Sequence, residues 1–150
     1  MGTQLTMIDE RFGKLFELGD IDAAQHAISR GDVLVLHAEL KKAYGPIHEV
    51  ICLSGPFNAK SILVFEGGIG LLAGADSYIP ILTFGYEGQG AYNFSAFLSA
   101  AGFAVSDATK FAPPLIVYSD GSITKGIRQG SDILWEDGNR TRVPKFLDEQ

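Results

Sequence analysis

Cysteine is almost absent from this chain of 150 residues, in which Cys52 is the single example. One thiol cannot close an intrachain disulfide, and the paired thiols of a cysteine-rich zinc site are missing. No run of about 18 apolar residues occurs, so no membrane span is predicted. The first ten residues lack the charged start and apolar stretch of a secretory signal. These absences predict a cytoplasmic protein without membrane contact.

Lysine, arginine and histidine are missing between Ser61 and Thr109, and this stretch contains four acidic residues. Over the whole chain the formal net charge is −6. Proteins that bind nucleic acids usually present a basic face, so nucleic acid is not expected as a partner. An acidic balance serves solubility, and it also suits a cationic protein partner. The four acidic residues are Glu66, Asp76, Glu87 and Asp107.

The amounts of apolar and charged residues are those of a folded protein. The hydrophobic fraction is 46% and the charged fraction is 20%, which argues against wholesale disorder. No linker-like or low-complexity segment divides the chain, and its length suits one domain. We therefore expect a single domain over residues 1–150.

Helical spacing is concentrated in the first third of the chain. One apolar stripe predicts a helix over residues 7–18 that ends before Gly19. A second stripe predicts a helix over residues 21–30, and the two would form a hairpin. Residues 32–44 begin like a strand and end like a helix, and we predict a helix there. The first stripe consists of Ile8, Phe12, Leu15 and Phe16.

Short β-branched and aromatic runs predict strands in the rest of the chain. In the middle third we expect strands at residues 50–53, 61–65 and 78–84, then a glycine-rich loop at 85–90 and a helix over 91–101.

The last third reads as a series of β-hairpins. Asp120-Gly121 and Asp137-Gly138 lie between β-forming segments, and Asp-Gly is a strong hairpin signal because both central turn residues need positive φ. The predicted fold class is α+β, with N-terminal helices packed on a mainly antiparallel sheet and C-terminal β-hairpins.

The glycine-rich loop at residues 85–90 leads from an apolar run into a helix, a topology in which backbone N–H groups can hold an anion. Its spacing differs from the dinucleotide and phosphate-loop motifs, and no basic residue is nearby in the sequence. Glu87 would also repel a phosphate. A structural turn, or an exposed loop that contacts a partner, is the favoured interpretation.

Cys52 follows His48 by four residues, so an imidazole could activate the thiol as a nucleophile. Its place within the apolar run 50–53 favours packing instead. His26, His37 and His48 recur every eleven residues, but glycine and proline interrupt any shared helix. We predict no catalytic residue, no metal site and no cofactor.

Tyrosine and carboxylate side chains near the glycine-rich loop predict a recognition surface. Tyrosine is enriched at interfaces because it offers a large contact area with few torsions to freeze. Tyr86 and Tyr92 flank the glycines most closely, and we expect them to be exposed. The predicted partner-binding residues are Glu66, Asp76, Tyr86, Glu87 and Tyr92.

The favoured function is that of a non-enzymatic protein-binding module, such as a bacterial immunity or antitoxin protein that neutralises a cationic toxin. The alternative is a small enzyme or small-ligand-binding domain that uses the loop at 85–90, with Glu87 or Cys52 as the reactive group. Self-association is left open.

Overall fold

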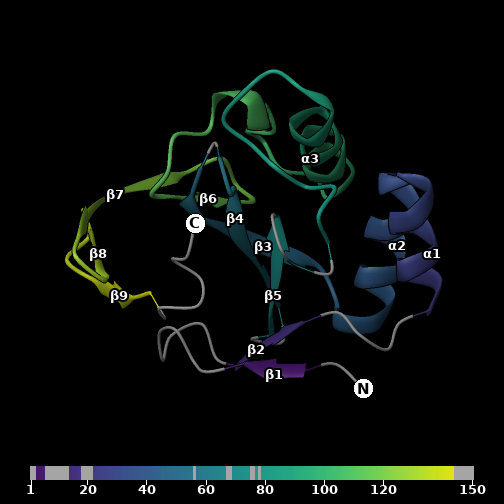
Figure 1. Ribbon diagram of the computed structural model, residues 1–150, viewed down its shortest axis with the longest axis horizontal. Coiled ribbons are helices and arrows are strands. Elements are labelled where there is room, and N and C mark those ends of the chain that lie inside the picture. The colour runs from purple at the N-terminus through teal and green to yellow at the C-terminus, as the bar shows by residue number, and fades with distance from the viewer. Residues whose placement is uncertain are drawn as a thin grey trace.

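The computed structural model describes residues 3–5, 14–17, 22–55, 57–66, 69–74, 77 and 79–143. In these residues nine strands form one sheet, in the order β1-β2-β5-β4-β3-β6-β7-β8-β9 (Figure 1). The strands are β1 (Thr3–Leu5), β2 (Lys14–Glu17), β3 (Ile47–Ser54), β4 (Lys60–Phe65), β5 (Ile69–Gly74), β6 (Leu115–Tyr118), β7 (Ile123–Gln129), β8 (Asp132–Trp135) and β9 (Arg140–Arg142). The helices are α1 (Asp22–Arg30), α2 (Val33–Tyr44), α3 (Gln89–Ala100) and the short 3-10 helix η2 (Ala108–Lys110).

Neighbouring strands are antiparallel throughout this sheet except for β2 and β5, which run parallel. The helices lie toward the N-terminus and in the middle of the chain, while the last four strands form successive antiparallel pairs. The predicted α+β class with a mainly antiparallel sheet is therefore confirmed.

The central strands are buried on both faces. All six residues of β4 are buried, and alternate side chains enter two separate hydrophobic clusters. Leu63 and Phe65 face the helices, whereas Ile62 and Val64 face the other way. Side chains alternate between the faces of a strand, so a continuous apolar run is what a strand covered on both sides requires.

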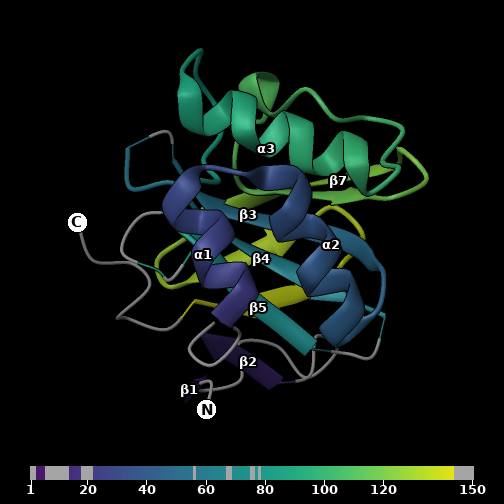
Figure 2. The same cartoon turned by 90° about the vertical axis from the view of Figure 1, so that its right-hand side faces the viewer.

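The three α-helices cover one face of the sheet. Figure 2 shows α1 and α2 in front of β3, β4 and β5, with α3 beside them toward β7. Leu36 and Leu40 of α2, and Phe94 and Phe97 of α3, are fully buried in the cluster on this face. No helix in the described ranges combines the length and hydrophobicity needed to cross a bilayer.

The opposite face is closed by the C-terminal hairpins, which curl over it (Figure 1). Trp135 of β8 is buried there with Ile51 and Ile116, and it pairs with Gly126 of β7. A Cβ atom at Gly126 would lie 2.7 Å from both Ile133 Cγ2 and Trp135 Cε3. Glycine at this position therefore lets the indole ring lie against the sheet.

The edge strand β9 is tied to its neighbour by charge. Asp132 of β8 forms ion pairs with both Arg140 and Arg142 of β9. The hydrogen bond from Arg142, followed by that from Arg140, lowers the pKa of Asp132 despite the opposing effect of burial. Both arginine side chains are exposed, so each pair contributes little to stability on its own.

The predicted helix over residues 7–18 is wrong where the structure describes it. Residues 14–17 form strand β2, which lies between β1 and β5 and pairs in register from Lys14 with Ile69 to Phe16 with Leu71. The other residues of the predicted helix, 7–13 and 18, lie outside the described part of the chain. The strands β1 and β5 supply backbone hydrogen bonds on both sides of residues 14–17. These pairings outweigh the helical spacing of the apolar residues, and the local sequence does not reveal them.

The predicted strand at residues 78–84 is also wrong, because residues 79–84 form no strand. Ile79, Leu82 and Phe84 are instead buried beneath the helices as part of the connection to α3. The strand in this region is β5 (Ile69–Gly74), which was not predicted from the sequence. Gly74 ends it at φ +103°, where a Cβ atom would lie 2.0 Å from the Ala59 carbonyl oxygen.

The other predicted elements are confirmed with shifts of a few residues at their ends. Residues 32–44 form a helix because Asp32 caps it, with Oδ1 accepting a hydrogen bond from the Val35 N–H at 3.2 Å. Gly45 ends this helix at φ +84° and donates its N–H to the Lys41 carbonyl at 2.8 Å.

His37 lies where α2 meets α3. Its ring meets Phe97 edge-on, with 5.4 Å between ring centroids. Burial, and after it the charge of Lys41, lowers the pKa of His37 below 6.5. The folded state therefore favours the neutral imidazole.

Two buried hydroxyl groups should respond to removal in opposite directions. Ser61 Oγ is buried and has no hydrogen-bond partner among the described residues, so Ser61→Ala should raise the free energy of unfolding by about 1 kcal/mol. Thr141 Oγ1 accepts the Trp135 Nε1–H bond at 2.8 Å, so Thr141→Val should lower it by about 1–3 kcal/mol. Urea unfolding measures both. A loss of stability in Ser61→Ala would show that the hydroxyl has a partner.

A second prediction concerns acid sensitivity. The unfolded chain binds a proton at His37 more readily than the folded one, so the free energy of unfolding should fall as pH drops below about 6.5. His37→Gln should reduce this slope between about pH 7 and pH 5. An unchanged slope in His37→Gln would contradict the prediction.

Candidate functional site

The glycine-rich loop at residues 85–90 is anchored at both ends by buried phenylalanines. Phe84 and Phe94 are fully buried, with 6.4 Å between their ring centroids. The backbone is held as well, because the Gly85 N–H donates to the Ala108 carbonyl at 2.9 Å and the Thr83 N–H donates to the Gly90 carbonyl at 3.2 Å. The loop is thus fixed to both η2 and α3.

Tyr86 fills the space that the glycines leave. Its hydroxyl lies 2.9 Å from Thr83 Oγ1, within hydrogen-bond distance. A Cβ atom at Gly88 would lie 2.3 Å from Tyr86 Cε2, and one at Gly90 would lie 2.0 Å from Thr83 Oγ1 and 3.2 Å from the Tyr86 hydroxyl. The glycines therefore permit the close approach of a tyrosine of the same loop.

Three of the predicted partner-binding residues lie on this loop and the first turn of α3. Tyr86 and Tyr92 are 41% and 50% exposed, which matches the exposure expected for them, and Glu87 lies between them in the chain and is exposed. We call these three residues, Tyr86, Glu87 and Tyr92, the tyrosine surface. Asp107, also exposed, precedes Ala108, whose carbonyl accepts the Gly85 hydrogen bond.

Glu66 lies apart from the tyrosine surface. Glu66 directly follows the last residue of β4. Phe84, which precedes the loop, lies near the first residue of β4 instead. A Cβ atom at Gly55 would lie 3.1 Å from Phe84 Cε1 and 3.4 Å from the Cβ of Ala59, the residue before β4. A strand of six residues spans roughly 20 Å. Asp76, the fifth predicted residue, lies outside the described part of the chain. The expected acidic face is thus not continuous through Glu66.

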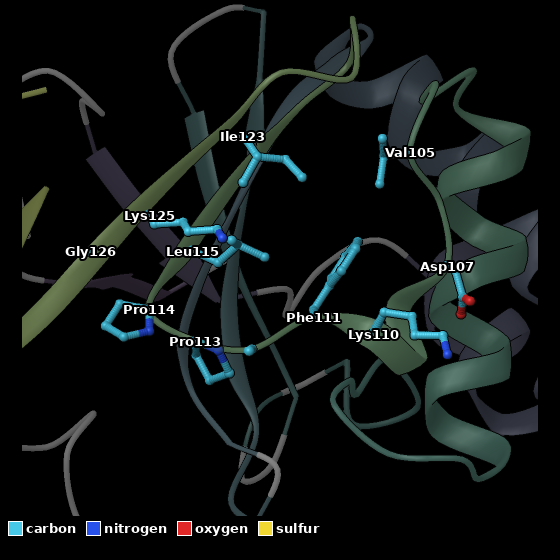
Figure 3. A pocket seen from close by; sticks show the side chains of 11 residues that line it. Val105, Asp107, Lys110, Phe111, Pro113, Pro114, Leu115, Ile123, Lys125 and Gly126 are labelled. Carbon is cyan, nitrogen blue, oxygen red and sulfur yellow. The ribbon is translucent and has the colours of Figure 1, made fainter. Parts of the chain in front are cut away.

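A cavity of about 420 Å³ lies on the other side of η2, between residues 105–114 and the strands β6 and β7 (Figure 3). Phe111 stands in the middle of the view, with Ile123 and Leu115 on one side and Val105 on the other. The lining residues are Val105, Asp107, Lys110, Phe111, Ala112, Pro113, Pro114, Leu115, Ile123, Lys125 and Gly126.

None of these cavity residues was predicted as a functional residue from the sequence. One signal was present in β7, where Ile123, Lys125 and Ile127 stand at every second position and so share one face. Apolar residues at period two are typical of a strand with one covered face. The structure leaves this one open, with Ile127 67% exposed.

Cys52 is placed where thiol chemistry is disfavoured. Its side chain is fully buried in the cluster beneath the helices, and this burial raises the pKa of the thiol. The thiolate is the nucleophilic form, so Cys52 is a packing residue. Among the described residues, no three histidine, cysteine or acidic side chains gather as metal ligands would.

Comparison of the chain with protein-family models, with curated proteins and with solved structures finds no match.

The close packing of Tyr86 against the glycines can be tested with a double-mutant cycle. Gly90→Ala should break the Thr83–Tyr86 hydrogen bond and lower the free energy of unfolding by about 1–2 kcal/mol. The cost should be smaller in a Thr83→Ala background, where the conflicting oxygen is gone. Chemical denaturation measures all four proteins, and additive effects would contradict the proposed contact.

Proposed function

We propose that this chain is a non-enzymatic protein-binding module that contacts its partner through the tyrosine surface. The observation that carries the proposal is the pair of tyrosines, 41% and 50% exposed, on a loop whose backbone and anchoring residues are fixed. Tyr86 packs against Gly88 and Gly90 on one side, and the part of each tyrosine that stays exposed is apolar and aromatic surface that a partner could cover.

The arrangement lowers the entropic cost of binding. Tyr86 is already held by Thr83 and by the shape of the glycine loop, so little freedom remains to be lost when a partner covers it. Preorganised tyrosines are efficient contact residues for this reason. Tyr92 lies one turn from Gly88, to whose carbonyl it donates its N–H at 3.0 Å, and is therefore fixed at its backbone by α3.

Charge favours a cationic partner. Glu87 belongs to a segment without lysine, arginine or histidine from residue 61 to residue 109, and the whole chain has a net charge of −6. Complementary charge speeds encounter and disfavours wrong partners more than it adds affinity. A bacterial immunity or antitoxin protein that neutralises a cationic toxin is the form of this proposal that suits these properties.

The enzyme or small-ligand alternative receives less support at the loop. Tyr86 and Thr83 occupy the space above Gly88 and Gly90 that a phosphate or substrate would need. Cys52, the alternative nucleophile, is buried with its pKa raised. Glu87, the other reactive group of this alternative, is exposed on the loop rather than enclosed in a pocket.

The test is to identify a partner by affinity capture and mass spectrometry, and then to measure its binding to purified variants. Tyr86→Ala and Tyr92→Ala should each weaken binding by about thirtyfold, as expected for contact residues worth about 2 kcal/mol. Glu87→Lys should slow association and reduce its dependence on salt.

Glu66→Lys is the matched control. It makes the same change of charge at an exposed carboxylate at the far end of β4. Binding through the tyrosine surface predicts that Glu66→Lys has a much smaller effect than Glu87→Lys. Equal effects would mean that only net charge matters, and unchanged binding in both tyrosine variants would overturn the proposal.

A further inference from the structure

We propose that the cavity between residues 105–114 and strands β6 and β7 binds a small organic carboxylate with an apolar body, anchored by Lys125. This site is separate from the tyrosine surface, and the inference does not depend on the proposed protein partner.

The size and lining of the cavity suit a small molecule. Its volume of about 420 Å³ falls within the range of roughly 300–1,000 Å³ that is usual for ligand sites. Seven of its eleven lining residues are apolar, which matches the mostly apolar walls of such sites. They are Val105, Phe111, Ala112, Pro113, Pro114, Leu115 and Ile123.

The charge inside the cavity is opposite to that of the chain. Leu115 and Lys125 are directly paired across β6 and β7, so their side chains share the face that lines the cavity. Figure 3 shows the Lys125 side chain reaching toward Leu115, whereas Lys110 lies on the side of Phe111 nearer Asp107 and α3. The lysine that enters the apolar part of the cavity is therefore Lys125.

The polar groups around Lys125 leave its ammonium available. Asp107 Oδ1 accepts hydrogen bonds from the Thr109 N–H at 3.2 Å and the Thr109 hydroxyl at 2.5 Å. Glu136 Oε1 accepts the backbone N–H of Lys125 at 3.0 Å. Within the part of the chain that the structure describes, neither Lys110 nor Lys125 takes part in an ion pair. An anion bound in the cavity would pair with the Lys125 ammonium, which Asp107 and Glu136 do not contact through an ion pair.

The sheet beside the cavity also exposes apolar surface. Ile123 and Ile127 lie on the same face of β7 as Lys125 and are 39% and 67% exposed. Burying such surface is favourable in proportion to its area. A ligand with a carboxylate at Lys125 and an alkyl or aromatic body along Ile123 and Phe111 would match both features.

Three probes of equal chain length separate charge from hydrophobicity: octanoate, 1-octanol and octylammonium, each titrated into the full chain by calorimetry and by NMR. Octanoate should bind saturably, at least about tenfold more tightly than 1-octanol, as expected for one hydrogen bond to a charged group. Octylammonium should bind more weakly than either. Equal binding of the three probes, or no saturable binding of octanoate, overturns the proposal.

Variants locate the site. Lys125→Met replaces the apolar stem of the side chain and removes its ammonium group, and it should lower octanoate affinity about tenfold while leaving 1-octanol unchanged. Lys42→Met, at an exposed position of α2, should leave both unchanged. Val105→Trp, which fills the cavity, should abolish binding of both probes, with circular dichroism confirming the fold. Unaltered octanoate binding in Lys125→Met or in a folded Val105→Trp overturns the proposal.

Discussion

Hydrophobic packing on both faces of β3 and β4 is the interaction on which the rest of this structure depends. Helices cover one face, and the C-terminal hairpins close over the other through Trp135. The connection between β5 and η2 is held to this core by Phe84 and Phe94. Because both phenylalanines are buried and the backbone of the loop is hydrogen-bonded at each end, the loop between them can expose Tyr86 while its ends stay in place.

The segment around α3 therefore serves two surfaces with different chemistry. On one side of η2 the glycine-rich loop exposes Tyr86 and Glu87, and on the other side Phe111 and Lys125 border an apolar cavity. The first contains the acidic Glu87 and is the surface that we propose for a protein partner. The second contains Lys125, which forms no ion pair with the described residues, and is the site that we propose for a small anion. The two share η2 through the hydrogen bond from Gly85 to Ala108.

The sequence predicted elements whose signals are local. The helix that begins after Asp32 and the Asp-Gly hairpins follow from capping and turn chemistry, and the exposure of Tyr86 and Tyr92 followed from their place beside glycines. Prediction from the sequence failed where contacts with residues distant in the chain decide the secondary structure. Residues 14–17 are a strand because β5 lies beside them, and the curl of β7 to β9 depends on Gly126 facing Trp135. The separation of Glu66 from Glu87 is likewise a matter of strand direction, which composition does not encode.

The outer strand β9 restricts how a second molecule can approach. It is three residues long, and two of these are exposed arginines tied to Asp132 of the adjacent strand. Short, charged outer strands resist the addition of a further chain by main-chain pairing. Main-chain pairing with another molecule is thus discouraged at this border of the sheet, where charged side chains rather than free backbone groups meet an approaching chain.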